Sequence, residues 1–234
     1  MICVFNDQSK LDNCLVRSLR MQEARFELLV ADNRYGKITC GAKTLNEMAL
    51  NAKYDYFMFV HQDVTLGSAA WLGNVQGDFK HLKQFGAAGV AGKSEAGLSA
   101  SVFHGTPPQF VGPQHLTEAV PVQTLDGCLM IVPKEIFLKN GFDEKTCKGW
   151  YLYVVDYCLD LARRGLKVYV LPHEVYHESR GPSDPTVYEE TKQNIIRKHR
   201  CHTSMVYTTM GNWKTGRKLS RFRRLLKNLR IRRT

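Results

Sequence analysis

The first part of the chain alternates short apolar runs with longer stretches in which apolar residues recur every three or four positions. The runs predict buried strands at residues 2–5, 26–31 and 56–60, and the spacing between them predicts amphipathic helices. Strands that alternate with helices form β-α-β units, whose strands lie parallel in one sheet. The pattern therefore predicts an α/β fold with a Rossmann-like, mostly parallel sheet flanked by helices.

The second half of the chain has a more mixed pattern. Small residues fill a strand predicted at 86–92, and the Gly- and Pro-rich stretch 95–117 holds no clear element, which is typical of loops or hairpins. Beyond it, the pattern predicts a strand at 128–132, a helix at 151–164, a strand at 168–171 and a helix at 185–200. The second half thus continues the α/β pattern around a loop-rich insertion.

Polar residues follow each of the first three predicted strands, as Asn6-Asp7, Asp32-Asn33 and His61-Gln62-Asp63. In open α/β sheets, ligands bind beyond the carboxyl ends of the strands. A lone Asp at a strand end is commonly a turn former. Three successive strands that deliver acids and amides to one edge instead indicate a ligand site.

His61 and Asp63 stand two residues apart at the end of an apolar strand. In extended backbone, residues with this spacing face the same side. An imidazole and a carboxylate can then converge on one divalent cation. The alternative is an ordinary polar strand end, and spacing alone does not decide between the two.

A second motif, Ala87-x-x-x-x-Gly92-Lys93-Ser94, fits the loose form of the phosphate-binding loop. That loop requires a strand before it and a helix after it, whereas no helical spacing follows Ser94. The favoured interpretation is a strand of small residues packed tightly on the sheet.

The charge is unevenly distributed along the 234 residues, whose formal net charge is +11. Residues 191–234 hold 14 of the 33 Lys and Arg and no acid, so residues 1–190 hold 19 basic and 22 acidic residues, a net of −3. The hydrophobic share of 44% excludes a mainly disordered chain. A near-neutral globule with a cationic tail argues against a cationic nucleic-acid-binding protein, which stays the least favoured alternative.

The tail, residues 214–234, is predicted to be a basic amphipathic helix. Its apolar positions gather on about a third of the helical wheel: Leu219, Phe222, Leu225, Leu226 and Leu229. Such a helix suits an anionic membrane surface. Packing on the globule or on a second subunit of a homo-oligomer, and nucleic acid, are the alternatives.

The chain shows no apolar run of membrane-spanning length and no signal peptide. Its seven Cys include no C-x-x-C pair, which favours reduced thiols over a disulfide framework or zinc ribbon. These features predict a cytoplasmic protein. If the basic tail binds lipid, the prediction becomes a peripheral protein on the inner face of the cytoplasmic membrane.

Several motifs in order give the chain a resemblance to a known family. After the His61-Gln62-Asp63 triplet come Leu125-Asp126-Gly127, Gly141-Phe142-Asp143-Glu144, Tyr153-x-x-Asp156-Tyr-Cys-Leu159, Arg164-Gly165-Leu-Lys-Val168 and Val175-Tyr-His177. Over residues 2–181 the sequence resembles family 2 glycosyltransferases of the A-type (GT-A) fold, in a subgroup that carries His-Gln-Asp in place of Asp-x-Asp. The resemblance implies a GT-A domain at 1–181, with a nucleotide-sugar half at 1–94 and an acceptor half at 95–181. A helical extension at 182–213 and the tail would follow.

The resemblance implies a donor of the nucleotide-diphosphate sugar class, with UDP, GDP or dTDP left open. It makes Asp63 the metal and diphosphate ligand, with His61 beside it and His177 closing the site. Mn²⁺ or Mg²⁺ would neutralise the diphosphate, which otherwise repels a carboxylate. The implied partners are this donor and a glycan or lipid-linked acceptor.

Further roles are implied for residues around the same edge. Asp32, with Asn33 next to it, would accept hydrogen bonds from the nucleobase, and Asn6 and Asp7 would line the ribose side. On the other side of the site, Asp126 and Trp150 would face the sugar and the acceptor.

The implied reaction is inverting transfer, in which one carboxylate takes the proton of the acceptor hydroxyl. Many family members carry an acid pair at the start of the helix near Tyr153, where this chain has Val154 and Asp156. We therefore expect Asp156 to be the base, with Asp126 as the alternative. The valine also leaves open a non-catalytic module that binds sugar nucleotides or glycans.

Overall fold

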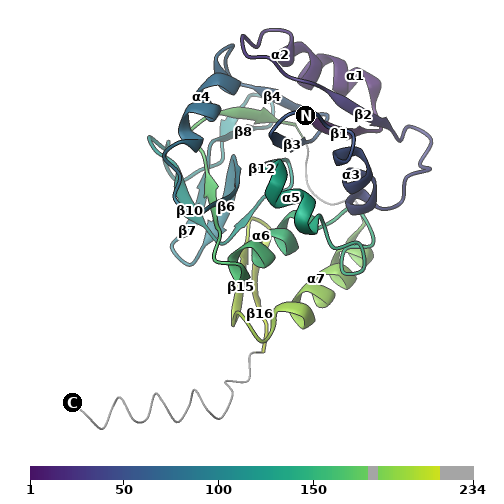
Figure 1. Ribbon diagram of the computed structural model, residues 1–234, viewed down its shortest axis with the longest axis vertical. Helices are drawn as coiled ribbons and strands as arrows, with labels where there is room; N and C mark the ends of the chain where they lie inside the picture. The colour runs from purple at the N-terminus through teal and green to yellow at the C-terminus, as the bar shows by residue number, and fades with distance from the viewer. Residues whose placement is uncertain (179–183, 217–234) are drawn as a thin grey trace.

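The central sheet of the protein is seen in a computed structural model that describes residues 1–178 and 184–216 (Figure 1). It draws on strands between residues 2 and 170. Its strands are β1 (Ile2–Phe5), β2 (Leu29–Asp32), β3 (Tyr56–Val60), β5 (Phe85–Gly89), β10 (Val120–Val122), β12 (Leu129–Pro133) and β13 (Lys167–Val170). In the described residues they follow the order β10-β13-β5-β12-β3-β1-β2. Only β10 and β12 run against the other five. The predicted mostly parallel sheet is confirmed.

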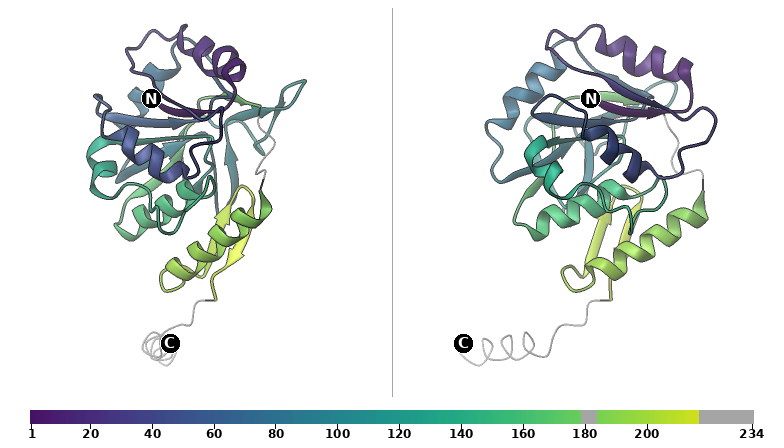
Figure 2. Two further views of the ribbon diagram at one scale, coloured as in Figure 1. Left: turned by 90° about the vertical axis from the view of Figure 1, so that its right-hand side faces the viewer. Right: turned by 45° about the vertical axis from the view of Figure 1, so that its right-hand side comes forward.

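Helices cover both faces of this sheet (Figures 1 and 2). They comprise a continuous segment of α1 (Gln8–Lys10), η1 (Leu11–Val16, a π-helix) and α2 (Arg17–Leu19), followed by α3 (Gly41–Ala49), α4 (Trp71–Phe79), α5 (Lys134–Asn140), α6 (Tyr153–Arg163) and α7 (Pro185–His199). The side chains of β3 explain why there is a hydrophobic core on each face of the sheet, because successive side chains of a strand point to opposite faces. Phe57 and Phe59 join the core under α3, α5 and α6, whereas Met58 and Val60 join the core under the first helical segment and α4.

Short strands fill the loop-rich stretch of the sequence. In the described residues they form two small sheets, β11-β6-β7 and β4-β14-β8-β9. Their bounds are β4 (Val64–Leu66), β6 (Ala91–Ser94), β7 (Gly97–Ala100), β8 (Val102–His104), β9 (Gln109–Phe110), β11 (Thr124–Leu125) and β14 (Val175–His177). The sequence showed no clear element over 95–117 because strands of two to four residues carry too little periodicity to detect.

The phosphate-loop interpretation is excluded by the local structure. Ala87 to Ser94 run from β5 into β6, and the chain then turns into the antiparallel strand β7 rather than into a helix. A Cβ on Gly92 would lie 2.5 Å from the carbonyl oxygen of Thr124 on the neighbouring strand β11. Gly92 thus permits a close strand contact, as the tightly packed strand interpretation expected.

The two predicted halves, 1–94 and 95–181, share one sheet, because β5 pairs with both β12 and β13. The predicted helical extension is only partly helical. After α7 the chain forms a hairpin of β15 (Met205–Thr208) and β16 (Gly211–Lys214), and Gly211, directly after the turn, has a φ of +134°. The amphipathic helix was predicted for residues 214–234, of which Lys214 instead belongs to β16 and 217–234 lie outside the described residues. Within the described ranges, every helix is too short or too polar to cross a bilayer.

Candidate functional site

The carboxyl ends of β1, β2 and β3 meet at one edge of the sheet, since β1 lies between the other two. The Gln62 amide joins two of these ends. Its Oε1 accepts hydrogen bonds from the backbone N–H of Asn6 (2.9 Å) and Asp7 (3.0 Å), and its Nε2 donates to Oδ1 of Asn6 (2.7 Å). Gln62, the middle residue of the His-Gln-Asp triplet, therefore fixes the ends of β1 and β3 relative to each other. The sequence assigned it no role.

The side chains of Asp7 and Asn33 make hydrogen bonds within their own turns. Asp7 caps the first helix through a hydrogen bond that its Oδ1 accepts from the backbone N–H of Lys10 (3.1 Å). The Asn33 amide makes two hydrogen bonds with the backbone of Ile38, at 2.8 and 3.1 Å, and so closes the intervening loop. A pocket of about 630 Å³ opens beside these turns, with Asn6 and Asn33 in its lining.

Asp32 lies at the end of β2 and is held by Arg34. The Arg34 guanidinium donates to both carboxylate oxygens, with its Nη2 2.6 Å from Oδ2, and lies over the ring of Phe5 at 5.7 Å. These hydrogen bonds hold the pKa of Asp32 below its usual value. Arg34 was missed at the sequence level, where an Asp-x-Arg spacing was the available signal.

His61, Asp63 and His177 converge as the resemblance implied, although more than a hundred residues separate the triplet from His177. Their ligand atoms all lie within 4.8 Å of one another. The pairing of β14 with β4 aligns His177 with Val64 and so brings the distant histidine to the triplet. Nε2 of His177 lies 3.5 Å from Oδ1 of Asp63, and the two imidazole rings are 5.5 Å apart.

The donor atoms of this trio suit a divalent cation. Nε2 of His177 is buried and accepts or donates no hydrogen bond among the described residues, an arrangement that is costly unless a ligand supplies the partner. Burial lowers the pKa of His61, and the neighbouring His177 lowers it further, which favours the neutral form that binds metals. His104 is not one of the three, but its Nδ1 donates a hydrogen bond to the backbone carbonyl of His177 and so helps to fix the position of His177.

Asp126 lines the same pocket from the loop between β11 and β12. One carboxylate oxygen accepts from the backbone N–H of Cys128 (3.0 Å) and the other from the hydroxyl of Thr209 (2.7 Å). Burial alone would raise the pKa of Asp126, but these hydrogen bonds outweigh it and keep the pKa below its usual value. Asp126 is therefore an ionised carboxylate facing the pocket.

Trp150 and Val154 complete the part of the pocket that the sequence anticipated. Trp150 packs on α3, where a Cβ on Gly41 would lie 2.9 Å from its ring, so the glycine leaves room for the indole. Val154, in the first turn of α6, is 2% exposed and presents an apolar side chain to the pocket. The pocket wall thus has no acid at the position where the resemblance expected one.

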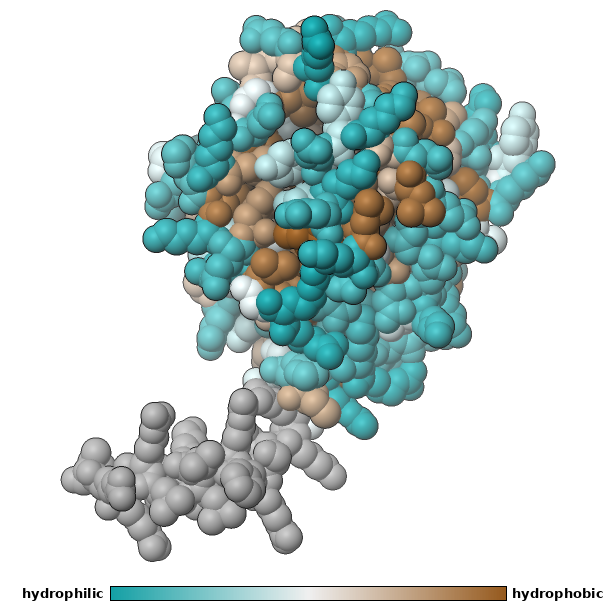
Figure 3. All heavy atoms as spheres, viewed as in Figure 1, coloured by the Kyte–Doolittle hydropathy of each residue, from teal (hydrophilic) through white to brown (hydrophobic). Residues whose placement is uncertain are grey.

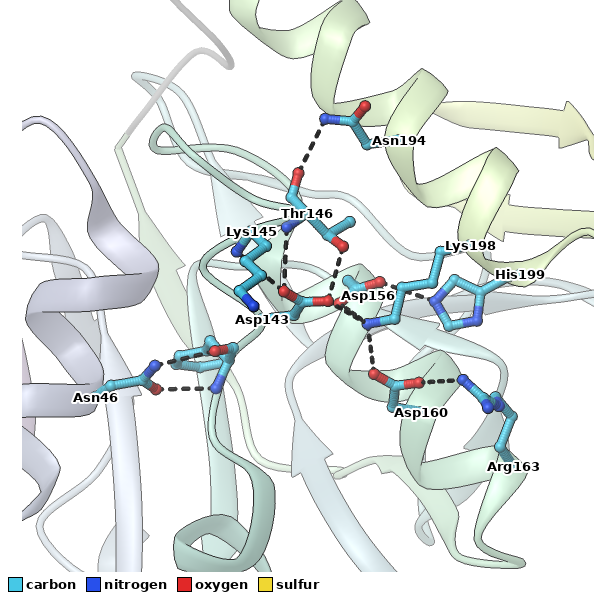
Figure 4. A network of polar contacts seen from close by, with 11 residues as sticks. Asn46, Asp143, Lys145, Thr146, Asp156, Asp160, Arg163, Asn194, Lys198 and His199 are labelled. Carbon is cyan, nitrogen blue, oxygen red and sulfur yellow. Dashed lines mark hydrogen bonds and ion pairs between the residues drawn. The ribbon is translucent and has the colours of Figure 1, made fainter.

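Asp156, which we expected to be the base, is not brought to the pocket. It is 1% exposed, and its two oxygens contact Nζ of Lys198 (2.6 Å) and Nε2 of His199 (2.8 Å) at the end of α7. Lys198 also reaches Asp160 (2.6 Å) and Asp143 (3.0 Å), as Figure 4 shows. A carboxylate buried in this ion-pair network contacts α7 and not a ligand in the pocket.

Comparisons with known proteins agree with the fold. The model of a family described as "Glycosyltransferase like family" matches residues 1–200. A comparison with curated proteins finds no match. Among solved structures, Staphylococcus aureus TarS (residues 1–349) in complex with UDP-GlcNAc aligns with a TM-score of 0.57 and 15% identity over 84% of this chain and 65% of that one.

Two further structures share the fold. GalNAc-T7 with UDP, GalNAc and Mn²⁺ aligns with a TM-score of 0.61 and 14% identity, over 86% of this chain and 47% of that one. The mannosyltransferase PcManGT from Pyrobaculum calidifontis, with GDP-Man and Mn²⁺, aligns with a TM-score of 0.53 and 12% identity, over 85% of this chain and 61% of that one. This chain spans less than two thirds of the length of each of the three. By its fold and by the family model that covers most of its length, the chain belongs to the glycosyltransferase-like family.

Proposed function

We propose that the protein transfers a sugar from a nucleotide-diphosphate sugar to a hydroxyl group of a glycan or lipid-linked acceptor, with inversion at the anomeric carbon. The observation that carries the proposal is the buried Nε2 of His177 beside Asp63 and His61, at the sheet edge where α/β proteins bind nucleotides. The complexes of TarS with UDP-GlcNAc and of PcManGT with GDP-Man support this class of donor. The His-Gln-Asp subgroup stays a prediction.

His61, Asp63 and His177 would hold a divalent cation, which stabilises the charge that develops on the leaving diphosphate. Two imidazoles and one carboxylate favour Mn²⁺ over Mg²⁺, because Mg²⁺ prefers all-oxygen coordination. Mn²⁺ accompanies the nucleotide or donor in the GalNAc-T7 and PcManGT structures. Before any cation binds, these three side chains already hold their ligand atoms close together, and Asp63 supplies the carboxylate.

The nucleotide would lie across the ends of β1 and β2. Asn6 and Asn33 line the pocket at this end. The Asn6 side-chain amide would face the ribose, whereas the Asn33 amide holds its own turn through Ile38. Asp32 would accept hydrogen bonds from the nucleobase. Its bidentate contact with Arg34 keeps the carboxylate ionised and fixed in orientation. Asp7 acts through its helix cap, which fixes the turn next to Asn6.

Asp126 is the base of the proposed reaction. Asp63 and Asp126 are the carboxylates in the described lining of the pocket, and the first belongs to the cation site. Asp126 would take the proton of the acceptor hydroxyl as that oxygen attacks the anomeric carbon and the diphosphate leaves. Asp126→Asn is expected to abolish transfer while the affinity for UDP with Mn²⁺ is retained.

A second function has one observation in its favour. Val154 occupies the pocket wall where related enzymes carry an acid, so the chain would bind sugar nucleotides without catalysing transfer. Val154→Asp separates the two functions. Turnover present in the natural chain supports the enzyme, whereas turnover that arises only in Val154→Asp supports a binding module.

The main test is a panel of UDP, GDP and dTDP sugars, each measured with and without Mn²⁺ by thermal shift and by release of the nucleotide. A donor that binds the native state raises its melting temperature. A Mn²⁺-dependent shift followed by nucleotide release supports the proposal, and the anomeric configuration of the product, read by NMR, tests inversion. No shift with any donor would exclude both functions.

The proposal extends to location through the tail. Residues 214–234, of which 217–234 lie outside the described part of the chain, would hold the enzyme on an anionic membrane surface. Sedimentation with vesicles of anionic and of neutral lipid, for the full chain and for a chain ending at residue 214, tests this. Equal sedimentation of both chains with anionic vesicles would overturn the membrane role.

A further inference from the structure

Helix α7 and the β15–β16 hairpin pack together as one unit after residue 184 (Figure 2). The ring of Tyr188 on α7 meets the ring of Trp213 on β16 edge to face at 6.4 Å, and Nζ of Lys192 lies over the same indole at 5.8 Å. Figure 3 shows a mostly hydrophilic surface over α7, opposite its buried residues Thr191, Ile195 and His199. The unit therefore has one face packed inward and one facing solvent.

Two side chains next to β11 dock the hairpin on the main body. The Gln123 amide donates to the carbonyl of Met205 (3.0 Å) and accepts from the backbone N–H of Tyr207 (2.7 Å). The Thr124 hydroxyl donates to the carbonyl of Tyr207 (2.5 Å). An amide that pairs with both backbone groups of a strand acts like an additional strand residue, so the position of the hairpin is well defined.

The other end of the unit is anchored by the buried network around Asp156. Lys198 and His199, at the carboxyl end of α7, contact this carboxylate on α6. Removing one partner of such a network leaves the other buried and unpaired, which is costly. The same carboxylate that the sequence suggested as a base thus fixes the C-terminal unit against the domain.

The hairpin reaches the pocket through its turn. Thr208, Thr209 and Met210 lie in the lining, and the Thr209 hydroxyl donates to Oδ2 of Asp126 (2.7 Å). The other oxygen of Asp126 is held by the backbone N–H of Cys128. Hence the orientation of the carboxylate depends on one contact from its own loop and one from the C-terminal unit.

The wall that this unit contributes has the chemistry of a sugar-binding surface. Tyr188 lies in the lining next to Tyr151, with their rings edge to face at 6.0 Å, and Met210, which follows Thr209, adds apolar area to the lining. A pyranose presents apolar C–H faces and a polar hydroxyl edge. Aromatic rings suit the first and an ionised carboxylate with a neighbouring hydroxyl suits the second.

Building on the proposed function, we propose that the α7–hairpin unit forms the acceptor wall of the pocket and receives a sugar ring of a glycan acceptor. Within it, Thr209 is a positioning residue that orients Asp126 toward the attacking hydroxyl. The unit is thus a part of the active site, although it follows the rest of the domain in sequence.

The positioning role is tested with Thr209→Val, which removes the hydroxyl at nearly constant volume, and Thr209→Ser, which keeps it. Asn212→Ala, on the exposed side of the same hairpin, is the control. With UDP-GlcNAc and GDP-Man as donors in the presence of Mn²⁺, kcat for nucleotide release should fall 10- to 100-fold in Thr209→Val. KM for the donor should stay within twofold, and Thr209→Ser should restore kcat.

The readouts separate the outcomes. Equal kcat in Thr209→Val and Asn212→Ala, or a change confined to KM, would overturn the positioning role. Hydrogen exchange of residues 185–215 shows whether the hairpin remains docked, and protection should be the same in all three variants. Absence of nucleotide release from the wild type would instead be a failure of the proposed transferase.

The acceptor wall is tested by saturation-transfer NMR on the complex with UDP and Mn²⁺. The probes are methyl glycosides of glucose, galactose, mannose and N-acetylglucosamine. Ring C–H protons of at least one glycoside should receive saturation, and Tyr188→Leu should reduce this at least threefold while Asn212→Ala leaves it unchanged. No transfer to any of the four, or equal transfer in Tyr188→Leu, would overturn the assignment. In either case UDP binding reports separately on the donor site.

Discussion

The described residues contain two clusters of histidine and carboxylate that have the composition of a cation site, and in one of them a lysine of the chain lies among the carboxylates. His61, Asp63 and His177 form the first, in the pocket, and Asp156, Asp160 and His199 form the second, between α6 and α7. In each cluster the ligand atoms lie within 4.8 Å of one another. In the second, Nζ of Lys198 stands 2.6 Å from both carboxylates (Figure 4).

The difference shows that ligand composition alone does not identify a metal site. Buried carboxylates need a positive charge, and in the second cluster the ammonium of Lys198 supplies it as part of the fold. In the first, among the described residues, Nε2 of His177 makes no hydrogen bond, and under the proposed function a divalent cation from solution would bind there. We therefore expect the second, closed cluster to contribute to stability, and the first, open cluster to serve the proposed function.

The largest effect is expected from Asp63→Asn in the open cluster. The variant removes the carboxylate that would face the cation and diphosphate, so turnover should fall about a thousandfold, or about 4 kcal/mol of transition-state stabilisation. Mn²⁺-dependent binding of UDP, followed by calorimetry, should also be lost. The control is Asp160→Asn in the closed cluster, which should keep turnover within threefold. A smaller than tenfold loss in Asp63→Asn would contradict the assignment.

Lys198→Met is expected to have the largest effect on stability. It leaves the carboxylates of Asp143, Asp156 and Asp160 without their shared cation, which should lower the free energy of unfolding by about 3 kcal/mol in urea titrations. Lys43→Met, which breaks an exposed pair with Glu47 on α3, is the control and should cost less than about 1 kcal/mol. Equal losses in the free energy of unfolding would show that the buried network stabilises the fold no more than an exposed ion pair does.

A third variant converts the closed cluster into an open one. Lys198→Ala vacates the centre of Asp156, Asp160 and His199, so Mn²⁺ should now stabilise the protein there. At ten times its dissociation constant, Mn²⁺ should add about 1.4 kcal/mol. The measurement compares Asp63→Asn with Asp63→Asn/Lys198→Ala, because the first change removes binding in the pocket. If Mn²⁺ stabilises both equally, charge balance does not account for the contrast between the clusters.

Much of the fold follows from local pattern. Residues 56–60 were predicted as a strand and form β3, and the strand at 2–5 and the helix near 153 also agree with β1 and α6. The hairpin at 205–214 was missed because its alternation is short and because long-range contacts, such as those of Gln123 with Met205 and Tyr207, specify its place. Such pairings leave no periodic signal in the sequence.

The candidate site, like the fold, could be predicted only in part from the sequence. The spacing of His61 and Asp63 was informative, because both belong to one strand end. The base was harder, since Val154 and Asp156 are two positions apart on a helix and so point about 200° apart at 100° per residue. Once Val154 faces the pocket, Asp156 faces away from it. Its partners at 198 and 199 lie on another helix, where the sequence alone does not place them.

The smallest expected effect is a dependence on pH in the closed cluster. Burial alone would raise the pKa of Asp143, but hydrogen bonds from Thr146 and Lys198 lower it to about 2. Because this lies below the usual value of about 3.9, the carboxylate stabilises the fold above pH 4, and this contribution is lost as the pH falls toward 2. Asp143→Asn should therefore be less stable than wild type by about 1 kcal/mol at pH 6, after allowance for solvent screening, and the difference should vanish near pH 2.

Urea titrations at pH 6, 4 and 2 measure this difference, and Lys198 provides its control. In the Lys198→Met background the same substitution at Asp143 should give a smaller pH-dependent difference, since Thr146 then lowers the pKa without the ammonium. A difference between Asp143→Asn and wild type that stays constant from pH 6 to pH 2 would mean that the carboxylate makes no ionic contribution. The closed cluster would then be held by hydrogen bonds and packing, and its contrast with the cation site in the pocket would lose its electrostatic basis.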